Sequence, residues 1–147
     1  MVSEGPITKD VLVKTVTKIL IPPIQLFGLY VIMHGHISPG GGFQGGVIIA
    51  SSFILYALVF GYREGAHRAK LKIRQFLEPL GPIIFGTIGL ICILFSGNFL
   101  QYSAIPILAN AEIAATAISL VEIGIGITVT AVIFSIFMAM GGRKTDG

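Results

Sequence analysis

Charged residues are scarce in this sequence of 147 residues. They make up 12% of the chain, about half the share that is usual in a soluble domain. Hydrophobic residues make up 54%, and the mean hydropathy is +0.89. There is too little polar surface to cover a soluble fold of this size, so the composition predicts an integral membrane protein.

Cysteine is almost absent and tryptophan is missing. The one cysteine, Cys92, lies in an apolar run, so the chain can form neither an internal disulfide nor a cysteine-based metal site. An iron–sulfur cluster needs several thiolates, so partner chains would have to hold it. We expect no metal and no cofactor in this chain, and any redox chemistry would belong to partners.

Four long apolar runs dominate the chain. They predict an all-α fold with four transmembrane helices in one membrane domain that covers residues 1–147. The helices are expected at about residues 10–33, 44–62, 80–100 and 113–140. Pro22 and Pro23 lack two N–H donors, so they predict a kink in the first helix.

Basic residues occupy only some of the connections. Three lie at the amino end, five lie between the second and third runs, and two lie in the tail. The positive-inside rule then places both termini in the cytoplasm and the first connection on the outer side. The basic residues follow this topology without interleaved aromatics, so nucleic acid is not an expected partner. We interpret Arg63–Arg74 as a cytoplasmic anchor at the bilayer surface.

The first connection is rich in glycine. Residues 34–46 read HGHISPGGGFQGG, with six glycines among thirteen residues and no charge. Glycine has a high backbone entropy cost, so such a run is expected where a close approach or a positive φ requires it. Gly40, Gly42 and Gly45 match Gly-x-Gly-x-x-Gly, but no βαβ unit can form among membrane helices, so we reject nucleotide binding.

We expect this turn to pack against a neighbouring subunit, whose backbone the glycines would admit while Phe43 wedges between helices. The expected packing residues are Pro39, Gly40, Gly41, Gly42, Phe43, Gln44, Gly45 and Gly46.

His34 and His36 stand at the start of the turn. They are half a metal site at best, because no cysteine accompanies them and His67 falls on the other side of the membrane. They either cap helix ends by hydrogen bonding to turn carbonyls, or they contribute a titratable imidazole to a proton or cation path.

Glu122 interrupts the last apolar run. Burying an acid in a membrane costs about 2.5–3.5 kcal/mol, so Glu122 should face protein or water. Small and polar residues share its helix face at spacings of three and four: Thr116, Ser119, Gly126 and Thr130. Such a face is typical of a helix–helix interface in lipid. Glu122 is then either a hydrogen-bonded packing residue or part of an ion path with Ser119, Thr130 and, near the outer end, Glu112. Oxygen ligands of this kind suit a sodium ion.

The stretch His34–Gly46 resembles the signature of the B subunit (MnhB/MrpB family) of Mrp-type multisubunit cation/proton antiporters. The segment Glu122-Ile123-Gly124 extends the resemblance over most of the chain, although family members often have Asp at the position of Glu122. Related subunits occur in archaeal membrane-bound hydrogenase and sulfane reductase complexes.

The resemblance implies a non-catalytic, multi-pass subunit of the cell membrane. Such a subunit would assemble with other membrane subunits of an antiporter module and contribute to the movement of sodium ions and protons. A purely structural scaffold with no ion path of its own is the alternative.

Overall fold

The computed structural model describes residues 11–35, 40–94 and 111–142, the last range without the side chains of residues 111–114 and 142. These residues form helices joined by turns, and four stretches of them are long and apolar enough to cross a membrane. The spans are Val11–Met33, Gly41–Phe60, Leu71–Leu94 and Ala115–Gly141. The prediction of an all-α membrane protein with four spanning helices is confirmed.

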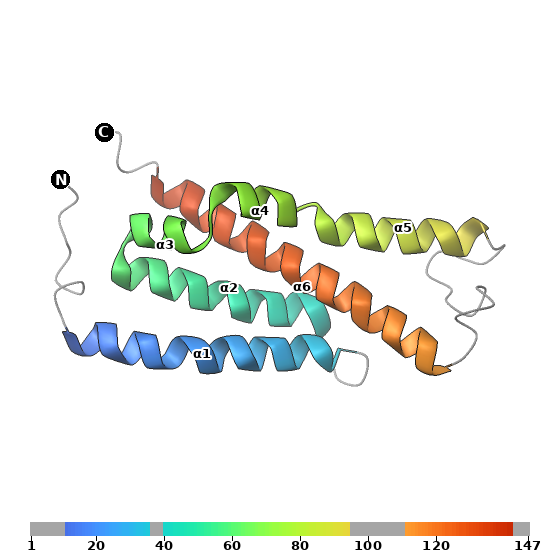
Figure 1. The fold of residues 1–147 in the computed structure, drawn as a ribbon, viewed down its shortest axis with the longest axis horizontal. Coiled ribbons are helices and arrows are strands. Elements are labelled where there is room, and N and C mark those ends of the chain that lie inside the picture. The colour runs from blue at the N-terminus through green and yellow to red at the C-terminus, as the bar shows by residue number, and fades with distance from the viewer. Residues whose placement is uncertain (1–10, 36–39, 95–110, 143–147) are drawn as a thin grey trace.

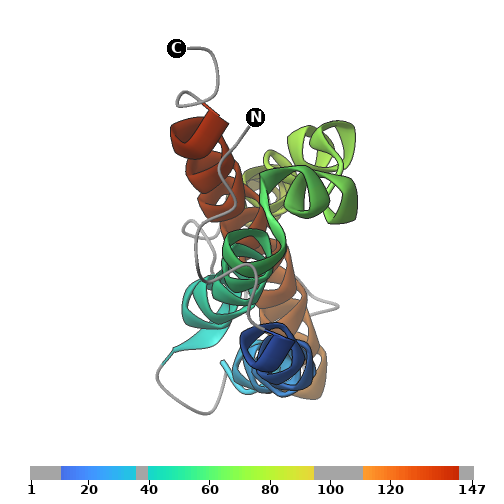
Figure 2. The same cartoon turned by 90° about the vertical axis from the view of Figure 1, so that its left-hand side faces the viewer.

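The helices are α1 (Val11–Met33), α2 (Gly41–Phe60), α3 (Tyr62–Arg68), α4 (Leu71–Leu77), α5 (Leu80–Leu94) and α6 (Ala111–Gly142). α6 lies at the centre: α2 packs on one side of it, α4 and α5 pack on the other, and α1 packs mainly on α2 (Figure 1). Figure 2 shows α6 crossing the α1–α2 pair obliquely. The start of α1 and the end of α6 lie at the same end of the bundle, and its assignment to the cytoplasm stays a prediction.

α1 continues through Pro22 and Pro23 as one helix. Because proline has no N–H, the carbonyls four residues earlier lose their helical donors. The kink expected there stays a prediction. Large apolar side chains on α1 are exposed on the isolated chain, for example Leu26 by 70% and Phe27 by 57%, and they give α1 a broad face for lipid or for another subunit.

α2 includes glycines that were expected to lie in the turn before it. The helix begins at Gly41, three residues before the expected start, after Gly40 with φ 142° and with Gly41 itself at φ 58°. Glycine adopts these angles without the strain that a Cβ would cause. The helix ends at Phe60, two residues before the expected end, because Gly61 at φ 99° turns the chain into α3.

The third span consists of α4 and α5 joined by a short turn. Hydrogen bonds from Glu78 N to Arg74 O (2.9 Å) and from Ile83 N to Pro79 O (3.0 Å) continue the helical pattern across it. α4 packs on α6, although it contains the end of the stretch Arg63–Arg74 that was interpreted as an anchor at the bilayer surface. The interpretation of Arg74 as a surface anchor is corrected, because this side chain is only 7% exposed. Residues 95–100 of the expected third helix lie outside the described residues.

Candidate functional site

Glycines on two sides of α2 bring the neighbouring helices into backbone contact. A Cβ built on Gly46 would lie 2.7 Å from the carbonyl oxygen of Gly126 in α6. A Cβ built on Gly45 would lie 2.6 Å from the carbonyl oxygen of Gly28 in α1. Such distances leave no room for a side chain, which is the reason that small residues mark helix interfaces in lipid. α2 therefore joins α1 to α6 through close backbone contacts.

The backbone that approaches these glycines belongs to the same chain, and the expected packing of the turn against a neighbouring subunit stays a prediction. Within the chain, α1 contacts Gly45, and α6 contacts Gly41, Gly42 and Gly46. Phe43 and Gln44 are exposed, Phe43 by 64%, so Phe43 does not wedge between helices of this chain. Its ring faces outward, where another subunit could contact it. Gly40 is exposed as well, and Pro39 lies outside the described residues.

Glu122 is half-buried in α6 and lies against the amino end of α2. The backbone N–H of Gly42 donates to its Oε2. Gly35, which follows α1, is also close, since a Cβ built there would lie 3.0 Å from the carboxylate carbon. Gly40 precedes the helix and supplies no side-chain cap. A carboxylate that follows Gly42 by 80 positions in the sequence therefore caps α2.

This contact is favourable for both partners. The first N–H groups of a helix have no partner within the helix, and they give its amino end a partial positive charge. A carboxylate there accepts a charge-assisted hydrogen bond, which is stronger than a neutral one. Glu122 is thus level with the turn between α1 and α2, and its carboxyl group completes the start of α2.

His34 directly precedes Gly35, which lies close to the Glu122 carboxylate, but the His34 ring contacts Tyr30 in α1 instead. The imidazole Nδ1 lies 3.0 Å from Tyr30 O, and the His34 and Tyr30 ring centroids are 4.1 Å apart. This is a helix-capping arrangement, one of the two alternatives from the sequence. A role of His34 in a proton path stays a prediction, and His36 lies outside the described residues.

Two further residues of the expected ion path hydrogen bond to main-chain carbonyls. The hydroxyl of Ser119, one turn before Glu122, donates to Ala115 O at 3.0 Å. Thr130 Oγ1 lies 2.7 Å from Gly126 O and 3.0 Å from Gly46 O. Thr130 therefore helps to join α6 to α2, about 12 Å along the helix from Glu122.

The backbone of Glu112 belongs to the first turn of α6, and its side chain lies outside the described residues. Thr116, on the same expected face, is exposed. The small and polar face of α6 was expected to run from Thr116 to Thr130. Within it, Glu122 and Thr130 contact α2.

A polar cluster that the sequence did not predict holds the α4–α5 turn on α6. Thr128 Oγ1 accepts a hydrogen bond from Gly81 N (2.7 Å) and donates to Leu77 O (3.1 Å). Two turns further along α6, the Ser135 hydroxyl donates to Glu78 Oε1 at 2.6 Å. The seven-residue spacing of Thr128 and Ser135 on one face of an apolar helix is the signal that could have revealed this contact.

Arg74 completes the cluster. Its Nε donates to Ala69 O and its Nη1 donates to Ser135 Oγ, both at 3.0 Å. The guanidinium also lies over the ring of Phe134, 5.3 Å from the ring centroid. A charged side chain of α4 is thus built into the helix packing.

Four apolar spans packed through glycine define a multi-pass membrane protein. Residues 12–139 match the family model described as a domain related to the MnhB subunit of Na+/H+ antiporter. Over 140 residues, the chain is 38% identical to a Staphylococcus haemolyticus (strain JCSC1435) protein that carries the name antiporter subunit mnhB2. A protein of the same name from Staphylococcus aureus (strain Newman) is 35% identical over 140 residues. Each alignment covers 92% of this chain and 97% of the relative. The chain belongs to the MnhB family.

Proposed function

We propose that this chain is a non-catalytic subunit of a cation/proton antiporter module in the cell membrane. Its family and its four spans support this role. The exposed apolar faces of α1 and α5, which include Phe27 and Leu90, suit contact with other membrane subunits. The same family resemblance allows a module linked to a hydrogenase or a sulfane reductase, and purification through a tagged chain would identify the subunits that accompany it.

Within this module, Glu122 is the group that responds to the transported ion. The observation that supports this role is the hydrogen bond from Gly42 N–H to the carboxylate. A backbone amide is a partner that a sodium ion or a proton can replace, because both bind the same carboxylate oxygens. Sodium is a hard cation that prefers oxygen ligands, and the Ser119 hydroxyl one turn away offers a second oxygen. Ion binding at Glu122 would then loosen the amino end of α2.

Glu122→Gln tests this role because glutamine keeps an oxygen for Gly42 N–H but carries no charge. We expect the module to assemble with this variant, while sodium-driven proton movement in vesicles falls about tenfold or more, equivalent to roughly 1.4 kcal/mol. Glu64→Gln removes an exposed acid from α3 and serves as the matched control, with transport expected to stay at the wild-type rate.

The second candidate is a purely structural scaffold role. The hydrogen bond from Gly42 N–H to Glu122 also favours this role, because it stabilises the start of α2 without any ion. In that case Glu122→Gln would leave transport intact in the assembled module. Gly42→Leu would instead prevent assembly, because the added side chain would meet the α6 backbone at Glu122.

A further inference from the structure

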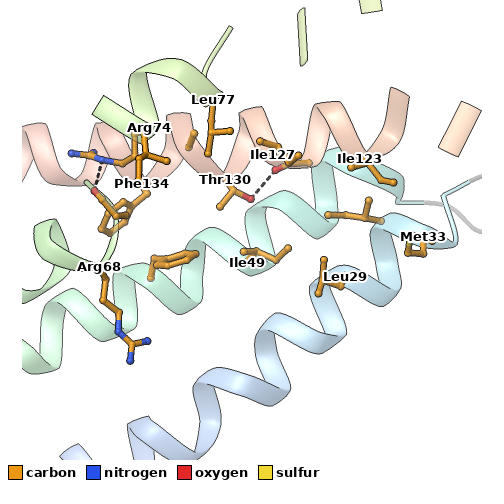
Figure 3. A pocket seen from close by; sticks show the side chains of 16 residues that line it. Leu29, Met33, Ile49, Arg68, Arg74, Leu77, Ile123, Ile127, Thr130 and Phe134 are labelled. Carbon is orange, nitrogen blue, oxygen red and sulfur yellow. Dashed lines mark hydrogen bonds between the residues drawn. The ribbon is translucent and has the colours of Figure 1, made fainter. Parts of the chain in front are cut away.

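A half-open groove runs along the joint between α2 and α6, bounded on its sides by α1 and by the segment that contains α4 (Figure 3). We call it the α2–α6 groove. Its volume is about 430 Å³, and its walls are almost entirely apolar. It extends along α6 from Ile123 to Phe134, roughly 16 Å at the helical rise per residue. Met33 lies near one end, and Arg68 and Arg74 lie at the other.

The two arginines give this end of the groove a positive charge with no ion pair among the described residues. Arg74 is more than nine-tenths buried, and its two hydrogen bonds go to neutral oxygens. Glu78 reaches it only through the hydroxyl of Ser135. The Arg68 guanidinium lies over the Tyr56 ring, 4.4 Å from its centroid. Arg74 is thus satisfied within the chain, with Glu78 one hydroxyl away. Arg68 is exposed and has no acidic partner among the described residues, so an anion from outside the chain can reach its guanidinium.

We propose that the α2–α6 groove binds one acyl chain of an anionic phospholipid, whose phosphate lies at the exposed guanidinium of Arg68. The planar guanidinium donates paired hydrogen bonds to phosphate oxygens, and an arginine already held over an aromatic ring loses little freedom when it does so. Basic pockets between membrane helices on the cytoplasmic side are suited to anionic headgroups. The positive-inside rule assigns the arginine end of the groove to that side. This proposal does not depend on the proposed function.

An acyl chain of an anionic lipid suits both parts of this site. The chain is apolar, as are the walls of the groove, and its headgroup carries a negative charge that Arg68 attracts. A helix of a neighbouring subunit would meet the same apolar walls, but it would bring an anion to Arg68 only if it carried an acidic residue at that level.

Photo-crosslinking of the assembled complex tests the proposal. A benzophenone-bearing phenylalanine analogue replaces Phe53, in the wall of the groove, and in a second sample it replaces Phe27, which is exposed on α1 outside the groove. The complex is placed in vesicles of equal parts phosphatidylglycerol and phosphatidylethanolamine, irradiated, and analysed by mass spectrometry of this chain. We expect phosphatidylglycerol adducts to dominate at position 53 and the two lipids to react equally at position 27.

Arginine variants measure the part that charge plays in this preference. Arg68→Gln should lower the phosphatidylglycerol preference at position 53 about fivefold, the equivalent of about 1 kcal/mol for one basic residue at the membrane surface. Arg68 is exposed, so this variant is expected to fold even if Arg74→Gln does not. Arg63→Gln, an exposed arginine on α3 outside the groove, should leave the preference unchanged.

Three outcomes would overturn the proposal. They are equal reaction of the two lipids at position 53, the absence of any lipid adduct there, and a cross-link from position 53 to another polypeptide.

Discussion

Replacing Gly46 with alanine is the most direct test of the contact between α2 and α6. A Cβ at this position would lie 2.7 Å from Gly126 O and 2.9 Å from the Cβ of Val129. Ordinary contacts begin near 3.4 Å, so the two helices would have to move apart by about 0.7 Å. Gly126 O is a backbone atom of α6, and the Cβ of Val129 is bonded directly to that backbone. Neither atom can rotate away as the tip of a flexible side chain can.

The expected loss of stability is about 1–3 kcal/mol, from the three terms that follow. Overpacking a close contact costs about 1–3 kcal/mol. The hydrogen bond from Thr130 to Gly46 O (3.0 Å) would stretch as the helices separate, and such bonds between membrane helices contribute about 0.6 kcal/mol on average. The higher helix propensity of alanine offsets this by up to about 1 kcal/mol. The net effect of Gly46→Ala is therefore clearly destabilising.

Gly86→Ala is the matched control. Gly86 lies within α5, and a Cβ built there would meet nothing within 4 Å, so only the gain in helix propensity should remain. The free energy of unfolding of the purified chain can be measured in mixed micelles by titration with SDS, followed by near-ultraviolet circular dichroism of the aromatic residues. If Gly46→Ala were no more destabilising than Gly86→Ala, the backbone contact between α2 and α6 would be refuted.

Two other polar contacts lead to predictions of the same kind, measured in the same titration. Thr128→Val keeps the shape of the side chain but leaves Gly81 N–H without its acceptor, and we expect a loss of about 1–3 kcal/mol. Thr87→Val, at an exposed position of α5, should change the free energy of unfolding by no more than about 0.5 kcal/mol. Equal effects of the two variants would contradict the hydrogen bonds of Thr128 to Gly81 and Leu77. Ser135→Ala removes the hydroxyl between Arg74 and Glu78 and should cost about 1–3 kcal/mol. Ser51→Ala, on an exposed face of α2, should change stability little, and a similar value for Ser135→Ala would speak against the cluster.

The membrane spans could be predicted from the sequence because their signal is local. A long apolar run and a basic connection can each be recognised from one continuous stretch of sequence, without knowledge of the residues that pack against it. The start of α2 could not be placed in the same way. Gly41 and Gly42 lower helix propensity when they are considered alone, and the carboxylate that completes the helix end comes from Glu122 in the last span.

The partner of a glycine face is equally hidden in the sequence. Glycine spacing shows that some backbone approaches, but it does not show whether that backbone belongs to the same chain or to another subunit. In the stretch from Pro39 to Gly46, α1 and α6 of the same chain approach Gly41, Gly42, Gly45 and Gly46, and its packing against a neighbouring subunit stays a prediction. Arg74 was misjudged for a similar reason, because its burial depends on Ser135 and Phe134, which lie in the last span.

The cap on α2 has a consequence for the order in which the protein is made. Translation delivers the α1–α2 pair to the bilayer well before Glu122 leaves the ribosome, so the Gly42 N–H must first use another acceptor, such as water at the level of the turn. When α6 arrives, it exchanges that acceptor for the Glu122 carboxylate and covers Gly42 and Gly46 with its backbone. A chain halted after Leu94 would therefore lack the helix that completes the start of α2.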